Sequence, residues 1–481
     1  MALRRASVTT LVVAAAGILS GACRQGASVA PPAAAPQVSL APRPAFVEAT
    51  PRGKAAWNDT RRFYGQRGHR LAWVAEGRPT DNFDQLIEAA LRAAEHGLDP
   101  ADYGAEALTA ARREVAARWP WRAETPPDPA LDTRLTYTFL RLARDLAQGR
   151  VDPTDVSPQF LGVEPRVDLV ARLESALGAH RVREALVQLA PTHPQYEWLQ
   201  QALPRYRTAA DTAGGEGTEA WWRARQIEMN MERWRWVPRT LGSRHILVNV
   251  PAYALEAIEG GRPVLAMRVV VGDPKSPTPL FSDKMTYVVF SPYWNIPESI
   301  LRAVTLVQAA DDPTFLARAG IEAVRGDGAA VERVDPATLD WSSNPAARGV
   351  RFRQVPGPAN ALGLVKFIFP NHFDVYLHDT PNRDAFERPR RAYSHGCVRV
   401  EDPVTLAEYA LGDQPAWTRD RIVRAMQTRE ESIAHVRQPI PVHIGYWTAW
   451  IERDGTLAFT DDPYDLDRRH ERAWRRGRAP R

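Results

Sequence analysis

The chain has 481 residues, which at roughly 100–200 residues per domain allows two to four domains. Hydrophobic residues make up 44% and charged residues 25% of it, a composition typical of globular proteins with a real core, which excludes a fully disordered or fibrous chain. The formal net charge is +5, but the last fourteen residues hold seven arginines against one glutamate. The basic character therefore lies in the tail, and we expect no nucleic-acid partner.

Residues 1–22 have the pattern of an export signal. Two arginines precede the apolar run LVVAAAGIL, which is too short to span a membrane, and small residues lead to Cys23. The segment SGAC resembles a lipoprotein signal, which implies Cys23 as a lipidated first residue. We expect export to the periplasm or cell envelope, with an outer-membrane lipoprotein as the lipidated alternative. Any membrane contact would then come through that lipid anchor.

The next segments indicate a tether and then helices. Residues 23–46 are rich in Ala and Pro and predict a disordered linker. Residues 47–207 predict a helical scaffold domain, since segments such as NFDQLIEAALRAAEHG place apolar residues at helical spacing. The glycine-rich residues 208–220 predict a flexible linker.

The pattern changes to strands after residue 221. Segments such as RHILVNVP, RPVLAMRVVVG and MTYVVFSP predict a mostly β domain over 221–435, interrupted by a helical insertion at about 299–355. Residues 436–466 predict a C-terminal β hairpin that packs on the scaffold or on the β domain, and 467–481 form the basic tail. The predicted fold class is multidomain α+β, with a helical scaffold followed by a mostly β domain.

The cysteine count singles out one thiol. Exported proteins usually use cysteines in pairs. Cys23 lies in the signal, so Cys397 is the one thiol left for the globular part and has no internal disulfide partner. A lone thiol in an oxidising compartment is open to oxidation, so we expect Cys397 to be either buried or functional.

Residues 378–402, HDTPNRDAFERPRRAYSHGCVRVED, surround this thiol with two histidines. The thiolate of Cys397 would be the reactive form, and a neighbouring imidazole can take its proton. His378 ends a strand pattern, whereas His395 lies two residues before the cysteine, on the same side of an extended chain. The residues alone do not choose between the two histidines. Gly396 allows a tight turn whose backbone N–H groups could form an oxyanion hole.

Two other interpretations of this stretch are open. His378, Asp379, His395 and Cys397 could bind a metal, but no paired Cys-x-x-Cys or His-x-x-x-His supports such a site, so we expect no metal. The cysteine could also be buried and inert, with two structural histidines beside it.

The arrangement H…SHGCVRV, with fifteen residues between His378 and Ser394, resembles the signature of the YkuD-type L,D-transpeptidases. Segments including QIEMNMERWRWVP, MRVVVGDPKSPTP and GLVKFIFPNHFDVYLHDTP resemble the large YcbB-like branch of that family. That branch usually carries a peptidoglycan-binding module between scaffold and catalytic domain, and here only RTAADTAGGEGTEA stands in its place.

The resemblance implies roles for the residues of the motif. Cys397 would be the nucleophile, His378 the general base and acid, and His395 a supporting residue. The backbone N–H of Gly396 would contribute to the oxyanion hole, together with that of Cys397.

Substrate contacts are also implied by the resemblance. Ser394 and Arg399 would shape the loop and touch the substrate, and the insertion would cap the substrate cleft. Tyr293, Trp294 and Phe367 could line that cleft, although Trp and Phe at strand positions more often belong to a plain core.

The resemblance thus implies a peptidoglycan L,D-transpeptidase that forms 3→3 cross-links through a cysteine thioester, with roles in cell-wall biogenesis and cell shape. Its partners would be a donor stem tetrapeptide, an acceptor stem and other cell-wall enzymes, and it would need no metal or organic cofactor. Carbapenems would acylate the thiol. Alternatives on the same site are an L,D-carboxypeptidase and a protein-to-peptidoglycan ligase. A non-catalytic peptidoglycan-binding lipoprotein and a zinc-binding module are alternatives of other classes.

Overall fold

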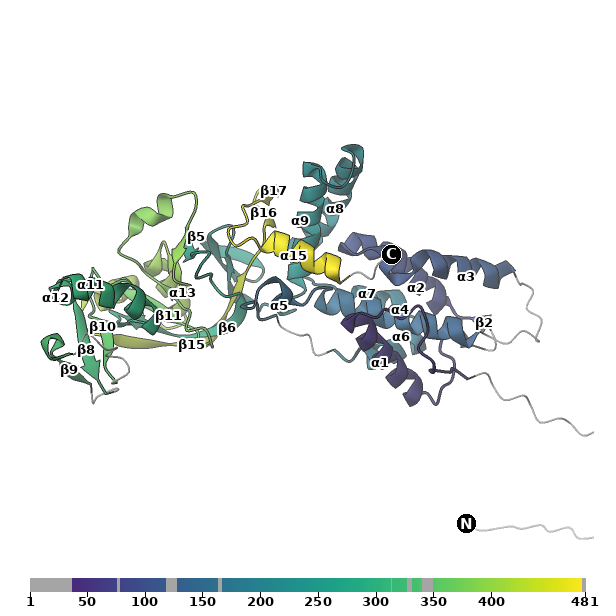
Figure 1. The fold of residues 1–481 in the computed structure, drawn as a ribbon, viewed down its shortest axis with the longest axis horizontal. Helices are drawn as coiled ribbons and strands as arrows, with labels where there is room; N and C mark the ends of the chain where they lie inside the picture. Colours follow the sequence, from purple (N-terminus) through teal and green to yellow (C-terminus); the bar gives the residue numbers. More distant parts are fainter. Residues whose placement is uncertain are drawn as a thin grey trace, which may run out of the picture.

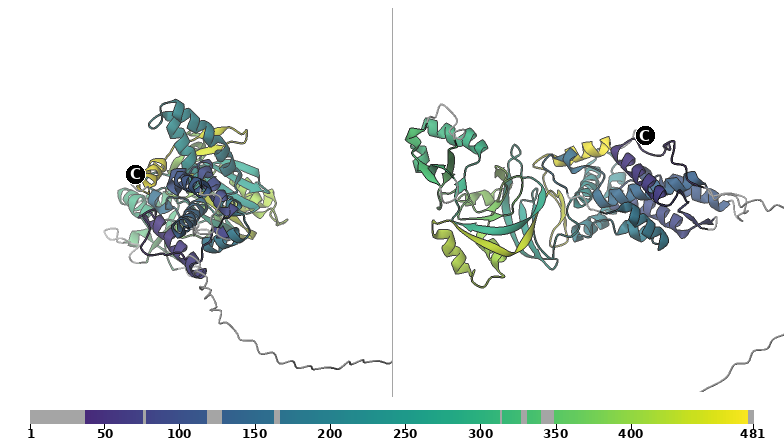
Figure 2. Two further views of the ribbon diagram at one scale, coloured as in Figure 1. Left: turned by 90° about the vertical axis from the view of Figure 1, so that its right-hand side faces the viewer. Right: turned by 90° about the horizontal axis from the view of Figure 1, so that it is seen from below.

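The computed structural model describes residues 37–75, 78–117, 128–162, 167–312, 314–326, 331–339 and 349–477. Helices occupy one end of an elongated molecule, a large β-sheet lies in the middle, and a smaller α/β unit forms the other end (Figures 1 and 2). This arrangement confirms the predicted fold class. The predicted signal, Cys23 and most of the predicted linker lie outside the described residues. No helix in the described part of the chain is long and apolar enough to cross a membrane.

The helical end is built around one long buried helix. The helices are α1 (Pro51–Gln66), α2 (Asp81–Leu91), α3 (Ala105–Ala117), α4 (Pro129–Gln148), α5 (Pro153–Val156), α6 (Leu169–Gly178), α7 (Val182–Val187) and α8 (Pro194–Thr212). The side chain of Asp128 caps the first turn of α4, Pro129 stands at its first position, and Gly149 follows its end. Leu135, Phe139 and Leu142 of α4 are buried, and so are polar residues such as Arg141 and Asp145, because α1, α2, α6 and α7 pack around this helix.

The predicted flexible linker 208–220 is mostly part of a helical hairpin. Helix α8 continues to Thr212, and α9 (Glu219–Trp234) begins after the capping side chain of Thr218. Gly214, Gly215 and Gly217 take positive φ angles in the turn between the two helices. The glycines therefore mark the turn, whereas the Ala- and Thr-containing residues before it extend the helix.

One nine-stranded sheet forms the middle of the molecule. Its strands are β3 (Arg244–Asn249), β4 (Ala254–Glu259), β5 (Arg262–Gly272), β6 (Phe281–Phe290), β11 (Val365–Ile368), β12 (Leu377–His378), β13 (Ala392–Ser394), β14 (Val398–Val400) and β15 (Ser432–Gly445). Their order is β13-β5-β14-β12-β11-β6-β15-β3-β4, and β4 also pairs with β5, which closes the sheet on itself. Helices α13 (Pro403–Leu411) and α14 (Arg419–Gln427) pack on it through buried Leu406 and Ile422.

The insertion contains a sheet as well as helices, so the prediction of a helical insertion was incomplete. Strands β7 (Trp294–Asn295), β8 (Ile321–Arg325), β9 (Glu332–Val334) and β10 (Arg351–Gln354) form a four-stranded antiparallel sheet, with α10 (Glu298–Ile300), α11 (Leu306–Asp311) and α12 (Phe315–Arg318) beside it. It has its own small core, which includes Leu301, Leu316 and Phe352. The insertion is thus a separately packed unit.

The C-terminal region differs from the prediction in two ways. Strand β15 lies between β6 and β3, so residues 436–445 belong to the central sheet, and the hairpin comprises only β16 (Ala449–Ile451) and β17 (Leu457–Phe459). The predicted basic tail forms helix α15 (Leu466–Arg476) in the residues described. Its apolar residues Leu466 and Trp474 are buried, which explains why this arginine-rich segment packs on the protein.

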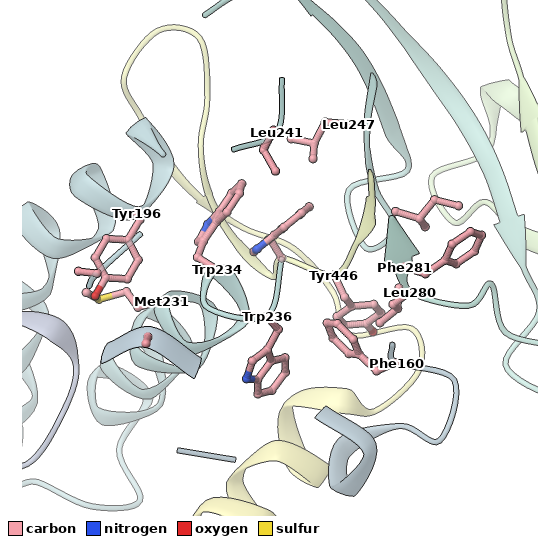
Figure 3. Close-up of a cluster of buried hydrophobic side chains, with 14 of the residues drawn as sticks. Phe160, Tyr196, Met231, Trp234, Trp236, Leu241, Leu247, Leu280, Phe281 and Tyr446 are labelled. Atoms are coloured by element: carbon pink, nitrogen blue, oxygen red, sulfur yellow. The ribbon is translucent and has the colours of Figure 1, made fainter. Parts of the chain in front are cut away.

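A buried aromatic cluster joins the helices to the sheet (Figure 3). Trp234 at the end of α9 stacks on Trp447, with ring centroids 4.3 Å apart, and on His193, at 4.1 Å. Trp236 meets Phe160 edge to face at 5.0 Å. The scaffold and the sheet therefore share one hydrophobic core at this seam.

A buried ion pair fixes α15 at the same seam. Arg233 and Asp467 lie 2.7 Å apart with side chains 1% and 3% exposed. Asp467 also accepts hydrogen bonds from Thr448 and Gln226. Leaving a buried charge without its partner costs about 3–5 kcal/mol of stability, so this pair stabilises α15 in its position.

We expect Asp467→Ala to lower the free energy of unfolding by about 3–5 kcal/mol, because it leaves the Arg233 guanidinium buried without its carboxylate. Urea unfolding followed by tryptophan fluorescence measures this. The control is Arg472→Ala on the same helix, whose exposed pair with Asp465 spans 3.7 Å and contributes little. Equal stability of the two variants would contradict the role given to the buried pair.

Candidate active site

The pairing of three strands brings the chemistry-bearing residues to one face of the central sheet. Strand β12 runs parallel to β14, with His378 beside Arg399, and antiparallel to β11, with His378 beside Lys366. Paired residues point to the same face, and so do residues two apart on one strand. Cys397 directly precedes β14 and Tyr376 directly precedes β12, and the same alternation places both on this face. The contacts of Tyr376 with His378 and Cys397 agree with that placement. We call this side of the sheet the site face.

The opposite face of the same strands is the hydrophobic core. Leu377, Val398 and Phe367 are fully buried there. Their alternation with polar residues is the period-two pattern of a sheet with one face packed. Burial of one set thus forces the polar set onto the site face.

His378 is buried and held in one tautomer. Its Nδ1 lies 2.5 Å from the carbonyl oxygen of Asp379, which can only accept, so Nδ1 carries the proton and Nε2 remains a proton acceptor. Burial, with smaller contributions from the nearby charges of Arg399 and Lys366, lowers the pKa of His378 to about 3, against the opposing effect of backbone hydrogen bonds. The imidazole is therefore neutral at physiological pH.

Cys397 lies half-buried in the turn between β13 and β14. Its Sγ is 3.9 Å from the carbonyl oxygen of Asp374. Burial raises the pKa of the thiol to about 11, and the shift is limited by hydrogen bonds from the backbone and side chain of Tyr376 and by the charge of Arg399. These groups would stabilise a thiolate once it forms.

The thiol and the imidazole are both neutral in this state. Tyr376 contacts both, with its ring edge-on to His378 at a centroid distance of 5.7 Å and its side chain hydrogen-bonded to Cys397. Across the described residues, no hydrogen bond joins Sγ to the His378 ring directly. Catalytic contacts of this kind are often long without substrate, so proton transfer would accompany attack rather than precede it.

The turn that carries Cys397 is braced from within. Ser394 Oγ donates to the carbonyl oxygen of Cys397 at 2.5 Å and accepts from the N–H of Gly396 at 3.1 Å. Thr278 Oγ1 donates to the carbonyl oxygen of Gly396 at 2.8 Å. Gly396 has a φ of 115°, a conformation that favours glycine. Ser394 is thus a buried residue that stabilises the turn. The N–H of Gly396 can donate to an oxyanion only if its hydrogen bond to Ser394 Oγ breaks.

The remaining predicted residues are spread over several places. His395 is exposed beside the turn. The guanidinium carbon of Arg353 lies 4.0 Å from the ring centroid of Tyr293. Trp294 packs on the core of the insertion. Phe367 does not line the site, because it points into the core from the opposite face.

Tyr376 and Lys366 are site-face residues that the sequence analysis missed. Tyr376 stands two residues before His378, a spacing that places both side chains on one face of a strand. That signal was available in the segment VYLH. Lys366 could not be placed in this way, because its position depends on the pairing of β11 with β12.

The described part of the chain contains no group of three or more His, Cys, Asp or Glu side chains that could hold a metal ion. The metal alternative for His378, Asp379, His395 and Cys397 therefore has no geometric support in these residues.

Known proteins resemble the two main parts of the chain. Residues 58–203 match the model of a scaffold domain, and residues 243–434 match that of the YkuD L,D-transpeptidase catalytic domain. A protein of Haemophilus influenzae named "Putative L,D-transpeptidase" is 32% identical over 312 residues, which are 65% of this chain and 60% of that protein. The chain thus spans about three fifths of that relative's length. These matches confirm the resemblance seen in the motif.

Two solved structures share 12% identity with the chain. An L,D-transpeptidase from Mycobacterium smegmatis covers 42% of this chain and 58% of its own, with a TM-score of 0.21. The Ldtfm–avibactam carbamoyl enzyme covers 43% and 50%, with a TM-score of 0.16.

The pKa directions predict how the thiol reacts with a neutral alkylating agent. The rate of modification of Cys397 by iodoacetamide should rise with pH beyond 9, toward the thiol pKa of about 11, without a plateau between about pH 5 and 8. Intact-protein mass spectrometry against pH measures this. Tyr376→Phe should slow modification at a given pH because it removes a hydrogen bond that lowers the pKa. A rate that levels off below neutral pH would instead indicate a preformed thiolate–imidazolium pair.

Proposed function

Because residues 243–434 belong to the YkuD family of L,D-transpeptidase catalytic domains, we propose that this protein transfers acyl groups between peptidoglycan stem peptides through Cys397. The observation that carries the proposal is the site face of β11, β12 and β14, which holds a thiol, a neutral imidazole and two cations together. A polymer of the cell wall requires export, in agreement with the pattern of residues 1–22.

The first half-reaction forms a thioester. Sγ of Cys397 attacks the carbonyl carbon of the amide that joins the L-centre of a diamino acid to the terminal D-Ala, while Nε2 of His378 takes the thiol proton. The carbon–nitrogen bond then breaks, and His378 returns the proton to the departing amine of D-Ala. Tyr376 offers donors beside the reacting sulfur. The acyl group remains on Cys397.

The second half-reaction transfers the acyl group to an amine. A side-chain amine of a second stem attacks the thioester, His378 takes the proton of that amine, and the carbon–sulfur bond breaks. Sγ recovers the proton, and a 3→3 cross-link results. One amide replaces another, so the exchange consumes no cofactor. His378 is favoured over His395 as the base, because its ring is fixed on the site face whereas His395 is exposed.

Water or a protein amine as acceptor would make the same site a carboxypeptidase or a protein-to-peptidoglycan ligase. A capping insertion favours amine transfer, since a thioester shielded from water survives until an amine arrives. The insertion begins at β7, directly after Tyr293, whose backbone oxygen contacts Lys366 on the site face. We therefore place cross-linking first among these reactions.

Mass spectrometry of the acylated protein tests the proposal. Incubation with a stem tetrapeptide or a carbapenem should add one covalent adduct to Cys397, and Cys397→Ala should show none. His378→Ala should slow acylation by roughly 100-fold or more, the usual contribution of a general base. His395→Ala should only weaken it.

The matched control is His372→Ala, an exposed histidine of the same domain, which should acylate at the wild-type rate. An adduct on another residue, full activity of Cys397→Ala, or a larger loss from His395→Ala than from His378→Ala would each contradict the assignment.

A further inference from the structure

His378, the proposed general base, lies between two cationic side chains on the site face. Arg399 of β14 pairs with His378 of β12, and His378 pairs with Lys366 of β11. Adjacent strands are about 4.8 Å apart, so the two cations flank the imidazole on opposite sides. Both act on it electrostatically, as their effect on the pKa of His378 shows. The proposed reaction uses the imidazole and leaves one of these cations, Lys366, without a role.

Lys366 has hydrogen-bonding capacity to spare. Its Nζ donates to the backbone oxygen of Tyr293 at 3.4 Å and lies 4.0 Å from Oε2 of Glu431, with the lysine side chain 16% exposed. The same Oε2 accepts the backbone N–H of Tyr293 at 2.8 Å. An ammonium group carries three donors. Two long contacts leave it able to bind a further acceptor.

Seen from the thiol of Cys397, Lys366 lies on the far side of His378 across the sheet. Cys397 directly precedes β14, His378 is on the neighbouring β12, and Lys366 is on β11, the next strand in the same direction. The acyl carbon is bonded to the sulfur, and the amine that leaves or attacks must meet Nε2 of His378. We therefore expect the atoms attached to that amine to extend over β11, the strand that carries Lys366. Lys366 Nζ would turn from its contacts with Tyr293 and Glu431 to meet them.

We propose that Lys366 binds the carboxylate of the amino acid whose amine leaves or attacks at Cys397. The inference rests on the proposed function. In the terminal D-Ala, the carbon that carries the amine also carries a carboxylate, and a charge-assisted hydrogen bond to it would hold that amine at His378. By the same contact the site selects acceptors whose amine stands next to a carboxylate. Such acceptors are diamino dicarboxylic acid side chains and free α-amino acids, in preference to plain aminoalkyl chains.

A matched pair of donors tests this. One stem tetrapeptide ends in the free carboxylate of D-Ala, and the other ends in the corresponding amide. Wild-type protein should form the Cys397 acyl-enzyme from the acid with a kcat/KM roughly 10–100-fold higher than from the amide, in line with a hydrogen bond between charged groups. Lys366→Met should bring the acid down to the level of the amide, and Lys366→Arg should keep most of the preference.

The control variant is Lys284→Met, an exposed lysine of the neighbouring strand β6, which should keep the full preference. The preference for the acceptor is measured from the rate at which each amine consumes the same acyl-enzyme. D-Alanine should react faster than D-alaninamide with the wild type. Lys366→Met should lose this difference. Thermal unfolding shows whether each variant is folded, and the acid-to-amide ratio of the wild type needs no variant at all.

The outcomes separate this inference from the function on which it rests. Equal reactivity of acid and amide in the wild type would overturn it while leaving acyl transfer intact. An equal fall for both donors in Lys366→Met would overturn it too, because it would show that Lys366 only holds Tyr293 and the insertion in place. If the wild type forms no acyl-enzyme from either donor, the proposed function fails, and the inference fails with it.

Discussion

Hydrogen bonding between the parallel strands β12 and β14 sets the register in which Leu377 lies beside Val398 and His378 beside Arg399. Because side chains alternate along a strand, this register sends the first pair into the core and the second pair onto the site face. A slip by one residue would exchange the two sets and bury the charged side chains. The position of the Cys397 thiol and of the His378 imidazole therefore depends on the packing of apolar residues behind them.

The rest of the chain supports this sheet from two ends. On one side, α9, α15 and the hairpin β16–β17 join it to the helical scaffold through stacked aromatic rings and the buried pair Arg233–Asp467. On the other side, the insertion follows β6 and returns before β11, the strand that carries Lys366 on the site face. The scaffold thus shares one core with the sheet, and the insertion begins next to Lys366 of the site face.

The sequence predicted that Cys397 and His378 lie near one another better than it predicted which residues surround them. Cys397 and His378 follow from a motif whose spacing is fixed along the chain, and both lie on the site face. Phe367 and Lys366 are neighbours in sequence on β11, and only pairing with β12 shows which of them faces the site. Glycines likewise marked the turn after α8 but not the extent of the helix before it, and arginines in α15 hid its buried Leu466 and Trp474.

A crystal structure of the wild-type protein acylated by a stem tetrapeptide tests the account most directly. The account predicts a carbonyl carbon bonded to Sγ of Cys397, with the vacated amine position within hydrogen-bonding distance of Nε2 of His378 and open toward Lys366. An acyl group on another residue, or one whose vacated amine position faces away from His378, would contradict it.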